Sequence, residues 1–305
     1  MQLKINSKHF LIILYLLIIF LNGCTEEMVN FELELVKANE IYFHSRLNTP
    51  YTGKVYSIYS NQTKKSDGYL LKGKKDGLWS EWYENGRIKS KENYSDGIAD
   101  GVWKQWYLNR QLRLKASFKE GKAHGLHEEW YSNGQKKEEG TYYYNEFDGN
   151  WIKWYPEGNK EAEGKYVRNK EEGRHIFWFT NGNKKSEAIF SNGKIVGTRI
   201  DWYENGKKKE EGTSEGVFTQ WYPNGNKKGQ GNYNNQVPVG KHILWHSNGN
   251  KKSVMYFIDG RPHGLRIEWY ENGHKKEEGN FNNGVQTGLW KYYNMDGTID
   301  GTEEY

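Results

Sequence analysis

The chain has few of the residues that build a disulfide framework or a thick apolar core. Of its 305 residues, one is a cysteine and five are prolines, and hydrophobic residues make up 35%. The single cysteine, Cys24, excludes intramolecular disulfides and any zinc site built from several cysteines. The low apolar content argues against a thick aliphatic core, because ordinary globular domains are about 45–50% apolar with glycine counted.

A strong excess of one charge is also missing. The 44 basic and 39 acidic residues give a net charge of +5, and the two signs are mixed along the chain. Nucleic acid is not an expected partner, because nucleic-acid-binding domains gather basic residues on one surface. Glycines and rings are abundant instead: 35 glycines, 13 tryptophans and 23 tyrosines. This aromatic content excludes a disordered chain, because disordered segments are poor in aromatic residues.

The first 23 residues have the pattern of a secretory signal peptide. Lys4 and Lys8 precede the apolar run 10–21. This run is too short to span a bilayer, which requires about 20 apolar residues. Its length and its basic flank are typical of the apolar region of a signal peptide.

The run ends in the sequence Leu21-Asn22-Gly23-Cys24, which resembles the lipobox of bacterial lipoproteins. This resemblance implies cleavage before Cys24 and acylation of that cysteine, which would anchor the chain to a membrane. The alternative is a signal anchor with a cysteine placed by chance. We expect a signal peptide at 1–23, a tether with a lead-in strand at 24–49, and a location at the cell envelope. The outer membrane or surface of a Gram-negative bacterium is the specific expectation.

A repeat occupies the remainder, 50–305. A tryptophan recurs every 24 residues, with one interval of 19, at Trp82, Trp106, Trp130, Trp154, Trp178, Trp202, Trp221, Trp245 and Trp269. A glycine lies five residues before each of them, and the glycine column continues to Gly53 and Gly288, which gives eleven units. The four other tryptophans share a second column three residues earlier, at Trp79, Trp103, Trp151 and Trp290. We interpret both columns as structural, as expected when each unit repeats one motif and packs on its neighbours.

The pattern of each unit predicts a β-hairpin. In the unit that begins at Gly77, two aromatic and polar arms flank Asn85-Gly86, and this pair predicts a type I′ turn with positive φ at both residues. A second turn is expected near Gly97. The resulting register places Trp82 opposite Lys89 on one face and Trp79 opposite Glu92 on the other. On the Trp79 face, rings are expected to pack over a column of small residues, mostly glycines. The fold class is therefore all-β: an elongated single-layer antiparallel sheet of hairpins.

The units resemble the MORN repeat, in the bacterial variant often described as the antitoxin of a toxin–antitoxin pair. The pattern that carries the resemblance is Gly-x-Trp-x-x-Trp-Tyr-x-Asn-Gly at 77–86, repeated from about residue 50 to the end. The resemblance implies a MORN-like solenoid and, as one functional alternative, an antitoxin or immunity protein that neutralises a toxin. An exported lipoprotein would not meet a cytoplasmic toxin.

No pattern predicts catalysis or a cofactor. The chain has no phosphate-binding loop, no dinucleotide fingerprint and no spacing typical of a nucleophile with its base. His127, His175 and His242 stand in the Trp79 column and are interpreted as rings that replace tryptophan. We expect no enzyme activity, no cofactor and no metal site.

A basic column follows the Asn-Gly turns and is the candidate binding stripe. Its members are Lys65, Lys89, Arg113, Lys137, Lys185, Lys209, Lys228, Lys252 and Lys276. Basic side chains beside rings would hold an acidic partner. The alternative is a solvated face whose lysine stems cover tryptophan rings. The leading hypothesis is a non-enzymatic, membrane-anchored scaffold or spacer that binds a protein or an envelope polymer.

Overall fold

The computed structural model describes residues 28–213 and 215–305. Cys24 and the signal segment lie outside the described residues. Strands and turns make up the described part, in which no helix is found, so the predicted all-β class is confirmed. Accordingly, no helix within this part is long and apolar enough to cross a membrane.

The chain divides into two compact units, 1–122 and 123–305. In the first unit, the strands β4 to β10, including the two-residue β8, form an antiparallel sheet in chain order. The strand β1 pairs in parallel with β4. The strands β2 and β3 form a separate hairpin. The strands are β1 (Val29–Asn30), β2 (Leu35–Ala38), β3 (Ile41–His44), β4 (Gly53–Ile58), β5 (Lys64–Leu71), β6 (Lys74–Trp82), β7 (Ile88–Ser95), β8 (Ile98–Ala99), β9 (Gly101–Trp106) and β10 (Leu112–Lys119).

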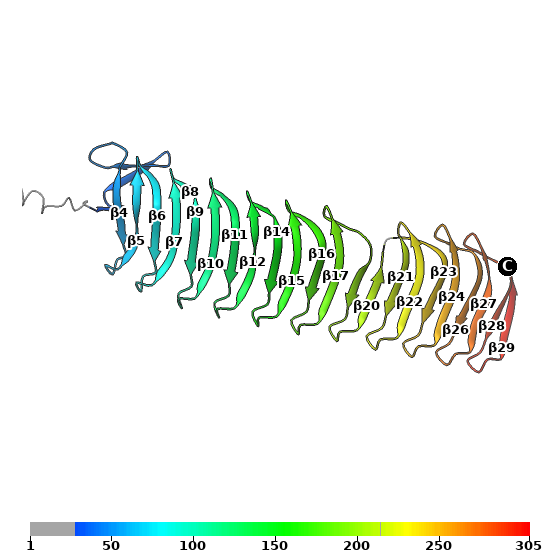
Figure 1. The fold of residues 1–305 in the computed structure, drawn as a ribbon. Coiled ribbons are helices and arrows are strands. Elements are labelled where there is room, and N and C mark those ends of the chain that lie inside the picture. The colour runs from blue at the N-terminus through cyan, green and yellow to red at the C-terminus, as the bar shows by residue number, and fades with distance from the viewer. Residues whose placement is uncertain (1–27, 214) are drawn as a thin grey trace, which may run out of the picture. The chain divides into compact units, whose positions relative to one another are not determined.

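The second unit is an antiparallel meander in which each long strand pairs with the next, as Figure 1 shows. It begins inside β11 (Lys122–Trp130) and continues with β12 (Lys136–Tyr143), β13 (Glu146–Phe147), β14 (Gly149–Trp154), β15 (Lys160–Val167), β16 (Lys170–Trp178), β17 (Lys184–Ser191), β18 (Lys194–Ile195), β19 (Arg199–Trp202), β20 (Lys208–Gly212), β21 (Gly216–Trp221), β22 (Lys227–Asn234), β23 (Val237–Trp245), β24 (Lys251–Ile258), β25 (Arg261–Pro262), β26 (Gly264–Trp269), β27 (Lys275–Asn282), β28 (Val285–Tyr293) and β29 (Ile299–Glu304).

The Asn-Gly turns differ from the predicted type. At 83–87 the Gly86 N–H donates to Tyr83 O over 2.8 Å, and the Tyr83 N–H donates to Arg87 O over 2.8 Å. Gly86 alone has a positive φ, 78°, whereas Asn85 does not. This is the pattern of a turn closed by one left-handed residue, with one more loop residue than a type I′ turn. The predicted type I′ geometry occurs at the second turn, where Asp96 and Gly97 have φ of 50° and 84°.

The extra loop residue changes the register next to the turn. Trp79 lies opposite Glu92 as predicted, but Trp82 pairs with Ile88 and a bulge follows. The prediction that Trp82 lies opposite Lys89 is therefore wrong. Lys89 contacts Glu81 on the Trp79 face, with its Nζ 3.0 Å from Glu81 Oε2. The basic column thus lies on the face opposite to the one predicted.

A different lysine column, one residue earlier, covers the tryptophans that end the strands. Lys64 Nζ lies 4.4 Å from the centre of the Trp82 ring, and Lys184 Nζ lies 5.5 Å from that of Trp202. The same lysines bind an acid three residues on, as Lys184 does with Glu187 over 2.8 Å. Lysine stems therefore shield these rings from water, as expected for a solvated face. The lysines that do so belong to the column one residue earlier and not to the basic column.

Rings of the Trp79 column pack on glycines of the preceding hairpin. A Cβ on Gly140 would lie 2.3 Å from the Trp151 ring, and one on Gly279 would lie 2.1 Å from Trp290. Trp151 and Trp290 are buried as a result. The predicted packing of rings over this column of small residues is confirmed, but each ring packs on the preceding hairpin: Gly164 lies opposite Trp151 and packs against His175. The contact joins successive hairpins, so it also fixes their stacking.

Tyrosine hydroxyls add a second link between successive hairpins. The Tyr131 hydroxyl donates to Trp154 O, and the Tyr155 hydroxyl donates to Trp178 O, each over 2.8 Å. The bond joins each turn to the end of a strand one repeat later. It explains why a tyrosine follows the repeated tryptophan in most units.

The left-handed turn residue gives a test of the turn geometry. We expect Gly182→Val to lower the free energy of unfolding by about 1–3 kcal/mol, because φ at Gly182 is 85° and a left-handed backbone strains a branched side chain. Arg110 occupies the same turn position with φ of 74°, so Arg110→Val replaces a residue that is already strained and is expected to cost much less. Urea denaturation of both variants measures the difference. Equal losses would contradict the turn assignment.

Candidate functional site

Part of the basic column is neutralised by carboxylates. Lys65 Nζ lies 2.6 Å from Glu32, Lys137 Nζ lies 2.7 Å from Glu129, and Lys276 Nζ lies 3.8 Å from Glu268. Lys89 pairs with Glu81 in the same way. Hydrogen bonding to the facing carboxylate raises the pKa of Lys65, Lys89 and Lys137. These four lysines are therefore committed to intramolecular pairs.

The other members of the column are exposed, and the structure gives them no ion pair within the described residues: Arg113, Lys185, Lys209, Lys228 and Lys252. The four lysines stand in successive hairpins of the second unit, and we call them the unpaired lysine stripe. They lack a carboxylate because the position of Glu81 is taken by Phe177, Gln220 and Leu244 in three of these hairpins. In the fourth, Arg199 holds Asp201 at 2.9 Å.

Apolar and aromatic groups accompany this stripe. Phe177 and Leu244 are 39% and 45% exposed. The ammonium group of Lys185 lies 5.8 Å from the centre of the Phe179 ring. A hollow beside Lys252 is lined by Trp269 and Tyr270, and also by Glu268, Glu271 and Lys276. The stripe therefore combines charge that is free to bind with apolar surface that a partner would cover.

Two of the three histidines replace tryptophan as predicted. His175 Nε2 hydrogen-bonds Lys165 O at 2.8 Å, and His242 Nε2 hydrogen-bonds Asn232 O at 2.9 Å. The Trp151 indole makes the equivalent bond to the carbonyl ten residues before it, over 3.0 Å. These imidazoles are satisfied parts of the sheet.

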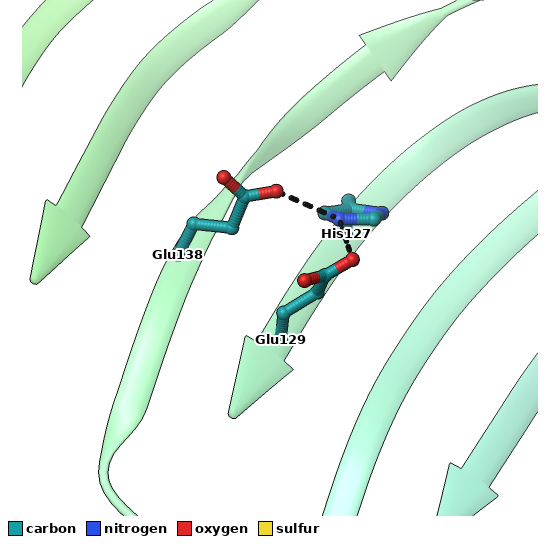
Figure 2. A group of neighbouring side chains, drawn as sticks. All are labelled: His127, Glu129 and Glu138. Atoms are coloured by element: carbon teal, nitrogen blue, oxygen red, sulfur yellow. Dashed lines mark ion pairs between the residues drawn. The ribbon is translucent and has the colours of Figure 1, made fainter. Parts of the chain in front are cut away.

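His127 departs from that pattern (Figure 2). Its Nε2 is buried without a hydrogen-bond partner and faces Glu138 Oε1 at 3.4 Å and Glu129 Oε1 at 3.6 Å. His127 and Glu129 lie on β11, two residues apart and so on one face, and Glu138 lies on the paired strand β12. The other carboxylate oxygens face lysines: Glu129 Oε2 is 2.7 Å from Lys137 and Glu138 Oε2 is 3.5 Å from Lys153.

The two carboxylates change the acid–base properties of His127. Burial disfavours its charged form, but the attraction of Glu129 and Glu138 outweighs burial and raises its pKa to about 9. The contact with His127, together with Lys137, lowers the pKa of Glu129 to about 2. The contact with His127 also lowers the pKa of Glu138.

Two other hairpins place a cation and two acids at the same three positions. Arg266 binds both Glu268 and Glu277, the latter over 3.1 Å. Arg199 binds Asp201, and Glu210 stands at the position that matches Glu138. Sequence reasoning missed this rule. The signal was present in the sequence. An acid two residues after the Trp79-column position and a second acid eleven residues after that position occur together in three units. In these units the column holds His127, Arg199 or Arg266.

Comparison with a family model bears on these hairpins. The model of the MORN repeat variant matches residues 75–96, 123–142, 195–215, 214–235 and 262–283. Five segments of the chain, less than half of its residues, are therefore similar to this repeat. The matched segments include β7, most of β11 and β12, and β27, so these matches coincide with hairpins of the structure.

Other comparisons give no functional information. No curated protein matches the chain. Among solved structures, "Crystal Structure of TcdB2-TccC3-Cdc42" is 10% identical, with a TM-score of 0.19, over 88% of this chain and 18% of the other. "Crystal Structure of TcdB2-TccC3" is 9% identical, with a TM-score of 0.16, over 83% of this chain and 18% of the other. The chain thus spans less than a fifth of those chains, and likeness at this level carries no argument.

Proposed function

We propose that this chain is a non-enzymatic scaffold, held at the cell envelope by an acylated Cys24, that binds an acidic protein or envelope polymer. MORN repeats suggest a binding scaffold. The observation that carries the proposal is the unpaired lysine stripe. Its four ammonium groups form no ion pair among the described residues, while four other members of the same column are neutralised by carboxylates.

The chemistry of the stripe favours an acidic partner. Exposed charges of one sign in successive repeats create a local positive potential that attracts and orients an acidic surface. The exposed side chains of Phe177 and Leu244 would lose contact with water in a complex. Screening by salt is expected to weaken this attraction, because the lysines are exposed.

The proposed anchor rests on the sequence around Cys24. The lipobox-like ending at Cys24 and the preceding apolar run support export and acylation. A lipid anchor would present the repeats to partners at a membrane surface, where even a moderate affinity gains from the shared location.

Two triple variants with equal net charge test the stripe. We expect Lys185→Gln, Lys209→Gln and Lys252→Gln together to weaken binding to anionic phospholipid vesicles, used as a model acidic surface. Each lysine near such a surface contributes about 1 kcal/mol, so three predict a loss of roughly a hundredfold. The control variant combines Lys65→Gln, Lys89→Gln and Lys137→Gln, which are paired with carboxylates.

Vesicle co-sedimentation at low salt measures both variants, and circular dichroism checks that both fold. The control triple is expected to bind nearly as well as the wild type. If both triples lose binding equally, net charge and not the stripe controls binding, and the proposal is wrong.

A further inference from the structure

The cluster around His127 has a use beyond scaffold binding. We propose that His127, Glu129 and Glu138 bind one divalent transition-metal ion, for which Zn²⁺ is the best match. The three side chains each direct one ligand atom inward, and these atoms lie within 4.8 Å of one another. Figure 2 shows both carboxylates pointing toward the imidazole from adjacent strands.

The two distances that reach His127 Nε2 fit a shared metal better than direct hydrogen bonds. His127 Nε2 is 3.4 Å and 3.6 Å from the two carboxylate oxygens. Hydrogen bonds between nitrogen and oxygen are usually about 2.7–3.2 Å long. Two ligands of a tetrahedral zinc ion, each about 2.0–2.2 Å from the metal, are roughly 3.3–3.6 Å apart. A metal would replace the direct ion pairs between Nε2 and the two carboxylates, and no other contact of Nε2 would have to be broken within the described residues.

Lysines hold the two carboxylates in the required orientation. Lys137 and Lys153 each contact an Oε2 atom, which leaves the Oε1 atom of each glutamate facing His127. Groups that hold metal ligands in this way support metal affinity. The same two positive charges oppose a bound dication, so we expect affinity in the micromolar range and not tighter.

The other hairpins show why only this one is a candidate within the described residues. Where two acids recur at the matching positions, Arg199 or Arg266 supplies a fixed guanidinium charge. Where histidine recurs, at His175 and His242, the imidazole bonds a backbone carbonyl. The hairpin of His127 alone combines an imidazole ligand with two carboxylates.

The ligand set favours zinc over calcium or magnesium. One imidazole nitrogen and two carboxylate oxygens are typical zinc ligands. Calcium takes six to eight oxygen ligands, and magnesium requires octahedral oxygen coordination. Three protein ligands leave a fourth zinc position for water or for a side chain of a bound partner.

Calorimetric titration of the purified chain with Zn²⁺ tests the site. We expect one saturable site, which His127→Gln and Glu138→Gln each weaken at least tenfold. His175→Gln is the matched control, because His175 occupies the same column but has no carboxylates at the two matching positions. The zinc affinity of this variant should equal that of the wild type.

Glu138→Gln keeps the size of the side chain, so it remains a test if His127→Gln does not fold. Wild-type affinity in a folded Glu138→Gln variant would overturn the proposal. So would the absence of saturable zinc binding, which would leave His127 as the protonated counterpart of Arg199 and Arg266. Neither result would affect the unpaired lysine stripe, which lies on other hairpins.

Discussion

The Gly140→Ala variant is expected to lose about 2–3 kcal/mol of unfolding free energy, a large effect for one added methyl group. The new Cβ would lie 2.3 Å from the Trp151 ring, closer than carbon atoms approach without a shift of ring or backbone. Trp151 is 4% exposed and its indole donates to Thr141 O over 3.0 Å, so the ring has little room to move. The added methyl therefore separates two hairpins that depend on each other for burial.

Gly301→Ala is the matched control for that variant. Gly301 lies in β29, its φ does not require glycine, and a Cβ there would meet no atom within 4 Å. Its stability is expected to stay within about 0.5 kcal/mol of the wild type. Chemical denaturation of both variants gives the comparison, and similar losses at the two sites would contradict the packing of rings over glycines.

Cys24→Ala is expected to abolish acylation altogether. Cys24 is the only cysteine of the chain, so no other thiol can accept the lipid. The variant should accumulate as a precursor that retains residues 1–23, because the lipobox-like sequence requires the cysteine for cleavage. Metabolic labelling with a fatty-acid probe, followed by gel electrophoresis, measures both effects. Unchanged labelling would exclude a lipid anchor at this residue.

The repeat itself could be predicted from the sequence because its chemistry recurs at fixed spacing. The glycine and tryptophan columns identified hairpins, and the register counted outward from the Asn-Gly turn placed Trp79 opposite Glu92, as the structure confirms. Stacked hairpins contact mainly their neighbours. A local pattern therefore determined most of the fold.

The number of loop residues in the Asn-Gly turn could not be predicted from the sequence. Asn-Gly suits a two-residue type I′ turn, but it also suits a longer turn in which glycine alone is left-handed. The structure has the longer form at Asn85-Gly86, and one extra residue moves Lys89 to the other face. An error of one residue in register thus reversed the surface assigned to the basic column.

The site residues depended on this register. Lys89 and Lys185 look equivalent in sequence, and only the true register shows that one faces Glu81 and that the equivalent position beside the other is Phe177. The sequence contains His127, Glu129 and Glu138, but it does not show that they are neighbours. They lie close together because β11 pairs with β12. Comparison among repeats would have separated His127 from His175 without a structure.

Capture of a partner from detergent-solubilised envelopes of the source cells tests the scaffold hypothesis most directly. Wild-type chain, the Lys185/Lys209/Lys252 triple and the Lys65/Lys89/Lys137 triple are each immobilised at equal density. We predict that the wild type and the second triple retain the same acidic partner, and that the first triple loses it. Equal retention by all three proteins would contradict the assignment of binding to the unpaired lysine stripe.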